Sequence, residues 1–204
     1  MLIELLPDNI DSRKVARIAE ALRQDGIVVY PTDTVYSVGC SLESARGIEK
    51  LARLKNLKPE KARFAIICSD LTHLSDYAKQ ISNPSFRLLK RLLPGPYTFI
   101  LDSGGNIPRH FPGNRKTIGI RVPDHPVPRA IVEALGCPII TTSLHDRDEM
   151  MEYPTDPEVI YDEWQDKADI VVASGSCGLV ASTVVDLTSG EPVVVREGKG
   201  EVNW

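Results

Sequence analysis

The stretch GIVVYPTDTVYSVGC, residues 26–40, decides how the rest of the chain is interpreted. Residues 27–30 are β-branched or aromatic, which predicts a strand buried on both faces. Pro31 has no amide hydrogen for a ladder, so we expect the strand to end there and a polar loop to follow. The polar residues 32–34 then lie at the carboxyl end of a strand, where ligands bind in open α/β sheets. The alternative is a hydrogen-bonded turn without a ligand.

The composition is that of a soluble globular protein, because the 204 residues are 42% hydrophobic and 25% charged. This length fits a single domain, residues 1–204, with an ample core. No apolar run approaches the roughly 20 residues of a membrane helix. The N-terminus is too short and too acidic for a signal peptide. We therefore expect a cytoplasmic protein without membrane contact.

The cysteine and histidine spacings do not indicate a metal centre. The four cysteines form no CxxC pair, so they predict small buried hydrophobes rather than a zinc site or a disulfide framework. The four histidines show no HExxH or similar spacing. We therefore expect no metal site built by the protein.

Helix and strand signals alternate in the first part of the chain, and strands cluster later. Caps and apolar stripes predict helices near 12–24, from 41 or 44 to 54, 70–79, 83–93, 125–135 and 157–164. Further strands are expected at 2–5, 64–68, 97–101, 117–122, 138–142, 169–173, 182–187 and 192–196. The predicted fold class is α/β (α+β): one domain with a twisted mixed parallel and antiparallel sheet, helices packed on it, and a ligand cleft.

Charge is distributed unevenly along the chain. Residues 46–121 hold 15 Lys and Arg against 5 Asp and Glu, whereas the rest of the chain holds 9 against 23. A positive middle region on an acidic protein suggests a polyanionic partner such as a nucleotide or RNA. The alternative is that these charges lie on scattered, solvated helix faces.

A lysine-rich segment follows the second predicted helix. Lys58, Lys61 and Arg63 lie there with only Glu60 opposing them. This charge density between a helix and a strand suits phosphate or RNA binding. The alternative is an exposed helix end whose cations complement the helix dipole.

Several predicted strands end in residues that can bind anions. Arg121 ends one strand next to a proline, which suits a bidentate grip on a carboxylate or phosphate. Arg196 ends another, and hydroxyl residues stand at Ser143 and at Ser182 and Thr183. No GxGxxG, Walker A or GxSxG pattern is present. A cleft that gathers these groups would suit a ligand with both phosphate and carboxylate groups.

Five motifs in order resemble the YrdC-like family, and in particular its YciO branch. They are PTDTVYSVGC (31–40), PGPYTFIL (94–101), TIGIRVPDHP (117–126), PIITTS (138–143) and STVVDLT…PVVVREG (182–198). The resemblance spans about residues 11–198. It implies a twisted mixed sheet with a concave, positively charged face. It also implies threonylcarbamoyl-AMP synthase chemistry, in which L-threonine, bicarbonate and ATP give threonylcarbamoyl-AMP and pyrophosphate for modification of adenosine 37 in tRNA. Double-stranded RNA binding is a further implied property.

The resemblance also implies roles for single residues. Arg121 would contact the threonine carboxylate, and Arg196 would reach toward the nucleotide. Lys55 and Ser143 are the implied catalytic residues. Magnesium would arrive with ATP rather than in a protein cage. The other implied substrate or nucleotide contacts are Thr32, Thr34, Thr142, Ser182 and Thr183.

Two motifs differ from those of the synthases. A Lys-x-Arg motif is replaced by Lys55-Asn56-Leu57, and a Ser-x-Asn motif by Ser143-Leu144-His145. Loss of a bidentate donor and an amide removes stabilisation of a polyphosphate transition state. We therefore expect weak synthase activity or another substrate. The alternative is a non-catalytic module that binds double-stranded RNA or tRNA. His145 is either a general base, a ligand-facing residue or a solvent-exposed loop residue.

Overall fold

One ten-stranded mixed sheet runs through the computed structural model, which describes residues 1–58, 64–113, 116–144 and 154–204. The strand order is β1-β8-β2-β3-β7-β4-β6-β5-β9-β10, with parallel and antiparallel neighbours. The strands are β1 (Leu2–Glu4), β2 (Val28–Tyr30), β3 (Ser37–Ser41), β4 (Ala65–Ile67), β5 (Tyr97–Asp102), β6 (Thr117–Arg121), β7 (Ile139–Ser143), β8 (Ile170–Ala173), β9 (Thr183–Asp186) and β10 (Val193–Arg196). The predicted mixed sheet with helices packed on it is confirmed.

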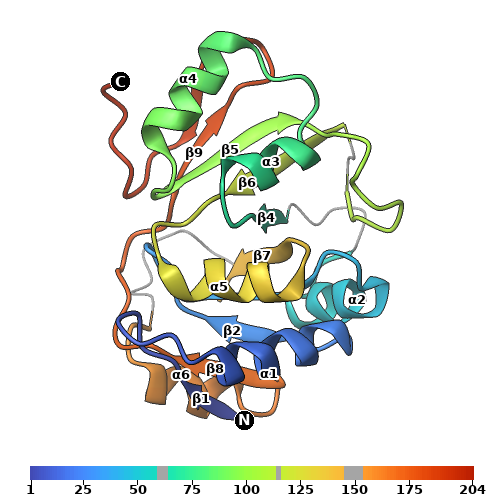
Figure 1. Cartoon of the computed structure of the whole chain (residues 1–204), viewed down its shortest axis with the longest axis vertical. Helices are drawn as coiled ribbons and strands as arrows, with labels where there is room; N and C mark the ends of the chain where they lie inside the picture. Colours follow the sequence, from blue (N-terminus) through green and yellow to red (C-terminus); the bar gives the residue numbers. More distant parts are fainter. Residues whose placement is uncertain (59–63, 114–115, 145–153) are drawn as a thin grey trace.

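Six helices of the described part pack on this sheet, and Figure 1 shows how they divide it. They are α1 (Ser12–Arg23), α2 (Ala45–Leu54), α3 (Leu71–Tyr77), α4 (Asn83–Leu92), α5 (Pro126–Leu135) and α6 (Pro157–Trp164). Helices α1 and α5 lie side by side over the lower half of the view, and α3 and α4 over the upper half. Two buried clusters follow from this arrangement, one with α1 and α5 and one with the other four helices.

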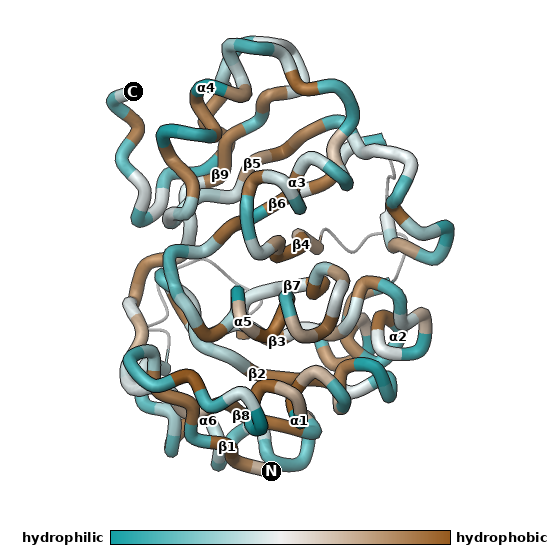
Figure 2. Tube along the Cα trace, in the orientation of Figure 1, coloured by the Kyte–Doolittle hydropathy of each residue, from teal (hydrophilic) through white to brown (hydrophobic). Residues whose placement is uncertain are grey.

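Local sequence signals determine the helix bounds. Asp11 accepts hydrogen bonds from the amides of Arg13 and Lys14 and begins α1, as a capping carboxylate should. Gly136 ends α5 in the left-handed conformation, with φ of 84°. Helix α1 buries one stripe, Val15, Ile18, Ala19 and Leu22. Figure 2 shows the wider hydropathy pattern: apolar residues concentrate on the strands and on the helix turns that face the sheet.

The polar loop expected after Pro31 is followed at once by a strand that was not predicted. Ser37–Ser41 is the buried strand β3, which pairs antiparallel with both β2 and β7. Its small and polar residues carry a weak strand signal, and neighbours distant in sequence decide its state. At Gly39 an added Cβ would lie 2.2 Å from the carbonyl oxygen of Ile140. The glycine therefore allows the close approach of β3 and β7.

Candidate functional site

Arg121 is the last residue of β6 and is held by the loop that follows β2. Its Nη2 atom lies 3.1 Å from Oδ1 of Asp33 and 3.0 Å from Oγ1 of Thr34. The side chains of Arg121 and Asp33 are each only 7% exposed. Two residues that the sequence placed at the site, Arg121 and Thr34, are therefore in direct contact.

The two threonines of this loop form a hydrogen-bond chain whose direction is fixed. The Thr32 hydroxyl donates to the carbonyl oxygen of Val35 at 2.7 Å, so its single hydrogen is used. The Thr34 hydroxyl must then donate to Oγ1 of Thr32, 3.0 Å away, and it accepts from Arg121. Both threonine side chains are buried. Their hydroxyls therefore hold Arg121 in place.

Asp33 connects three segments, although sequence reasoning did not single it out as a site residue. Its second carboxylate oxygen accepts from the amide of Asp124 at 3.1 Å, in the loop after β6. Its main-chain oxygen accepts from Nζ of Lys199, near the C-terminus. The available signal was its place between Thr32 and Thr34 beside a strand end.

The charge of Arg121 is buried and partly compensated. Burial lowers the pKa of Arg121, while the carboxylate of Asp33 acts in the opposite direction. Arg196 is near enough to lower this pKa as well, so the two predicted arginines share one region. Arginine stays protonated in proteins. Its Nε atom is buried without a hydrogen-bond partner among the described residues, which leaves a donor for a ligand.

A second group of predicted residues surrounds the start of β9. The Ser182 hydroxyl lies 2.8 Å from that of Thr98, a residue that sequence reasoning missed, and Arg196 donates to the Ser182 carbonyl at 2.9 Å. Thr183 donates to the carbonyl oxygen of Gly200 at 2.6 Å and accepts from the amide of Gly198 at 3.0 Å. The Thr183 hydroxyl thus fixes the segment after β10.

Small residues line one face of the sheet between these groups. In β4, β6 and β5, Ile66, Ile120 and Phe99 point into the core. Because side chains alternate, Ala65 and Gly119 face the other side, where they are partly exposed. A Cβ at Gly119 would lie 3.3 Å from Ala65 Cβ and from Thr98 Cγ2. Arg121 is two residues further along β6 and shares this face.

The predicted catalytic residues form a third group. Lys55, only 4% exposed, donates from Nζ to the carbonyl oxygens of Ser143 and Leu144, each at 3.0 Å. Thr142 precedes Ser143 in β7 and pairs with Val38. Lys55 and the main chain of Ser143 are therefore in direct contact.

Strand direction separates this third group from Arg121. Strands β2 and β7 are both antiparallel to β3, whereas β4 and β6 run opposite to β7. The carboxyl ends of β2 and β6 therefore do not share an edge, and the expected convergence at one strand edge does not explain the site. Hydrogen bonds from the loop after β2 bring Asp33 and Thr34 to Arg121 instead.

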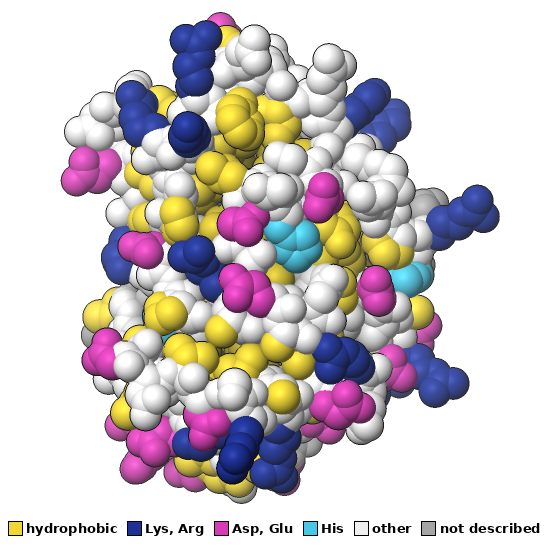
Figure 3. All heavy atoms as spheres, in the orientation of Figure 1, with side chains coloured by type: hydrophobic (Ala, Val, Ile, Leu, Met, Phe, Trp, Pro, Cys, Tyr) yellow, Lys and Arg dark blue, Asp and Glu magenta, His cyan; other side chains and the backbone are white. Residues whose placement is uncertain are grey.

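The structure describes only part of the predicted basic segment. Lys58 is exposed, while Lys61 and Arg63 lie outside the described residues. His145, which follows β7, also lies outside them. On the face seen in Figure 3, basic and acidic side chains are interspersed. A concave basic cleft is therefore not established.

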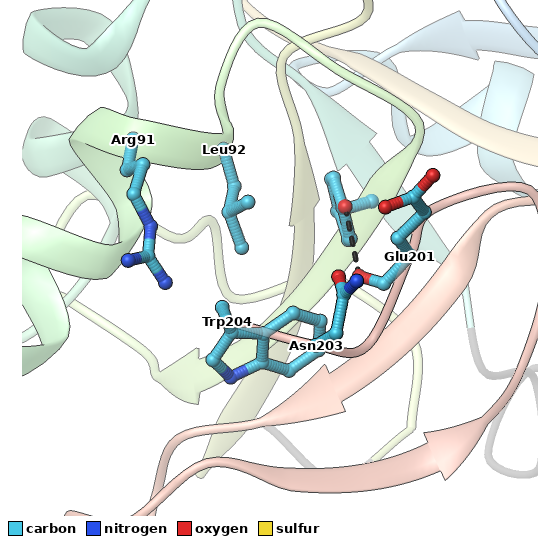
Figure 4. Close-up of a pocket in the computed structure, with 6 residues that line it drawn as sticks. Arg91, Leu92, Glu201, Asn203 and Trp204 are labelled. Carbon is cyan, nitrogen blue, oxygen red and sulfur yellow. Dashed lines mark hydrogen bonds between the residues drawn. The ribbon is translucent and has the colours of Figure 1, made fainter.

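One surface hollow lies apart from Arg121, at the end of α4. It has a volume of about 300 Å³ and is lined by Arg91, Leu92, Tyr97, Glu201, Asn203 and Trp204. Figure 4 shows Arg91 and Leu92 extending toward Trp204 and Asn203 of the C-terminal segment. Tyr97 belongs to the core side of β5, so this hollow is on the opposite face from Thr98.

Possible metal ligands and thiols were located among the described residues. Those residues contain no group of three or more His, Cys, Asp or Glu side chains that could hold a metal ion. Cys40, Cys68 and Cys137 are buried, as predicted, and Cys177 is partly buried. Burial raises the pKa of the Cys177 thiol to about 11, so it is protonated at neutral pH.

None of the helices in the described ranges has the length and apolar character of a membrane span.

Comparisons with known proteins show the family of the chain. Residues 20–198 match the Sua5/YciO/YrdC family model, which carries the description "Telomere recombination". The uncharacterized protein YciO of Escherichia coli is 42% identical over 198 residues, 96% of this chain and 94% of that protein. A threonylcarbamoyl-AMP synthase of Pyrococcus abyssi is 27% identical and covers 94% of this chain, which spans 56% of the synthase.

Two solved structures have the same fold. The crystal structure of E. coli YciO superposes with a TM-score of 0.90 at 39% identity, covering 100% of this chain and 98% of its own. P. abyssi Sua5 complexed with L-threonine gives a TM-score of 0.86 at 27% identity, covering 97% of this chain and 57% of its own.

Proposed function

We propose, from the premise that the chain belongs to the Sua5/YciO/YrdC family, that it binds a threonine-like amino acid and ATP beside Arg121. The proposed reaction joins the amino acid, bicarbonate and ATP into a carbamoyl adenylate, with release of pyrophosphate and water. The observation that carries the proposal is the buried guanidinium of Arg121, whose Nε has no partner among the described residues. A buried, charged donor without an acceptor is costly unless a ligand supplies one.

Arg121 would bind the amino-acid carboxylate. A hydrogen bond between a guanidinium and a carboxylate is charge-assisted and about twice as strong as a neutral one. Gly119 and Ala65 are partly exposed on the same face of the sheet, and the body of the ligand would lie over them. Ser182 and Arg196 would contact the nucleotide, as the resemblance implies.

Catalysis would come from position and charge. A phosphoryl or adenylyl transfer needs aligned reactants and cations near the developing charge, with no side-chain nucleophile. The charge of Lys55 at the end of β7 would serve the phosphates. Asp33 is engaged by Arg121 and Asp124, so it is not offered as a metal ligand. Magnesium would arrive with ATP, and no step is assigned to a protein-bound metal.

The rate is expected to be low because one cation of the synthases is missing. Leu57, which is 39% exposed, stands where the resemblance places an arginine. Replacing a charged donor by an apolar side chain removes charge stabilisation from a polyphosphate transition state. Slow turnover with threonine, or turnover of another small amino acid, follows from this difference.

Calorimetric titration of the purified chain with ATP and Mg²⁺, and then with L-threonine, tests the binding. Saturable binding of both ligands is expected, and Arg121→Ala should lose threonine binding. Arg17→Ala, at an exposed position of α1, is the matched control. Absence of ATP binding at millimolar concentration would contradict the proposal.

A second candidate function is binding of double-stranded RNA or tRNA without turnover. Helix α4 favours it, because Arg87, Lys90 and Arg91 are exposed and the helix contains no acidic residue. Binding through phosphates weakens steeply as salt is added, and each lost contact reduces the salt slope by about one. Arg87→Ala combined with Lys90→Ala should lower RNA affinity and this slope. Affinity that does not depend on salt would argue against RNA binding.

A further inference from the structure

We infer that Asp33 is a positioning residue, which holds Nη2 of Arg121 so that Nε is the donor presented to the carboxylate of the amino acid. This inference rests on the proposed function, because it names the group that prepares the same binding site. Asp33 does not itself touch the ligand in this account. It acts through Arg121.

The donors of Arg121 can be counted. A guanidinium has five N–H groups, and two of them belong to Nη2. Asp33 and Thr34 accept at 3.1 and 3.0 Å, so both hydrogens of Nη2 have protein partners. Nε is buried without one among the described residues. The protein therefore fixes one end of the guanidinium and leaves Nε for a ligand.

Asp33 is itself fixed in a way that only a carboxylate allows. Its two oxygens accept from Arg121 and from the amide of Asp124. An asparagine of the same size would place its amide nitrogen against one of these two donors. Asp33→Asn thus disturbs the contact with Arg121 while it keeps the volume of the side chain.

The pair also sets the local charge. Both side chains are only 7% exposed, so without Asp33 the guanidinium would be a buried charge with no compensating carboxylate. With Asp33 present the pair is neutral, and the site is suited to one further negative charge rather than to a free dianion. The expected ligand group is therefore a carboxylate in preference to inorganic phosphate.

Calorimetry with two probes, L-threonine and inorganic phosphate, tests this preference. In Asp33→Asn, threonine affinity should fall about tenfold or more, because small misplacements of a binding group are costly. Phosphate affinity should stay the same or rise, since the guanidinium is no longer neutralised. Asp124→Asn is the matched control, because only its main-chain amide contacts Asp33. An equal loss for both probes, or unchanged threonine affinity, would overturn the inference.

Two further measurements complete the test: a double-mutant cycle, and the NMR signal of the Arg121 Nε–H group in the ligand-free protein. In an Arg121→Ala background, Asp33→Asn should have no further effect on threonine binding. In ¹⁵N spectra, the buried Nε–H of Arg121 should exchange slowly with water in the native chain and in Asp124→Asn, and rapidly in Asp33→Asn. If the native chain bound no threonine, the proposed function would fail, and this signal alone would decide the role of Asp33. An Nε–H signal unaltered in Asp33→Asn would refute that role.

Discussion

Lys55 lies with its Nζ atom 3.0 Å from the carbonyl oxygen of Ser143, and it contacts the carbonyl oxygen of Leu144 at the same distance. The end of α2 is thereby joined to the end of β7, which are 88 residues apart in sequence. A lysine implied to serve phosphates is thus also a structural link.

Lys55→Met should lower the free energy of unfolding by about 2–4 kcal/mol, because two buried carbonyl oxygens lose a charged donor. Urea unfolding monitored by circular dichroism measures this change. Lys58→Met, at an exposed position three residues further on, should alter stability by less than about 0.5 kcal/mol. Equal stability of the two variants would contradict the structural role of Lys55.

Thr183→Val should destabilise the protein by about 1–3 kcal/mol, since it leaves the Gly200 carbonyl and the Gly198 amide without their hydroxyl partner. The side-chain volume is nearly unchanged, so packing is not the cause. Thr72→Val, on the exposed side of α3, is the control and should be close to neutral. A similar melting temperature in both variants would indicate that the Thr183 hydroxyl has no structural role.

Gly39→Ala should cost about 2–4 kcal/mol, because the added Cβ meets the carbonyl oxygen of Ile140 at 2.2 Å. The strands β3 and β7 would have to move apart. Gly105→Ala is the matched control, since a Cβ there meets nothing within 4 Å. Thermal unfolding of both variants checks the contrast, and a tolerated alanine at residue 39 would show that the strand spacing is not fixed.

His125 should make stability depend on pH. Its Nδ1 accepts from the amide of Val127 at 3.3 Å and caps α5, which requires a neutral ring. Burial lowers its pKa from the ordinary value of 6.5, and the carboxylates of Asp33 and Asp124 oppose this. Below pH 6.5 the unfolded chain therefore binds the proton more readily than the folded chain. Stability should be fully present above pH 6.5 and fall as the pH drops toward and through the folded-state pKa.

His125→Asn should flatten this dependence, because asparagine caps a helix without titrating. Chemical unfolding between pH 7.5 and pH 5 in both proteins provides the comparison. A slope that is the same in the native chain and in the variant would exclude His125 as its source.

Much of the fold could be predicted from local signals. Capping residues such as Asp11 and Asp70 and the proline at the start of α4 place helices with short-range chemistry alone. Strand β3 could not be predicted in this way, because its state depends on pairing with β2 and β7. The strand order is likewise set by contacts between segments far apart in the sequence.

Only part of the candidate site could be predicted, because most of its contacts join segments that are far apart in the sequence. Arg121 and Thr34 could be placed together because the resemblance supplied their relation. Thr98 and Lys199 could not, since a lone threonine in a strand and a lysine near the C-terminus carry no local signal. Asp33 was visible as a polar residue, but only its buried contact with Arg121 gives it a role.

Pyrophosphate release from ATP by the purified chain, with L-threonine, bicarbonate and Mg²⁺, tests the proposed activity most directly. We predict slow release that requires threonine and bicarbonate and that Arg121→Ala abolishes, while Arg17→Ala retains it. Release that is independent of threonine, or that persists in Arg121→Ala, would contradict it. No release from a chain that still binds ATP would mean that the pocket serves another substrate or RNA.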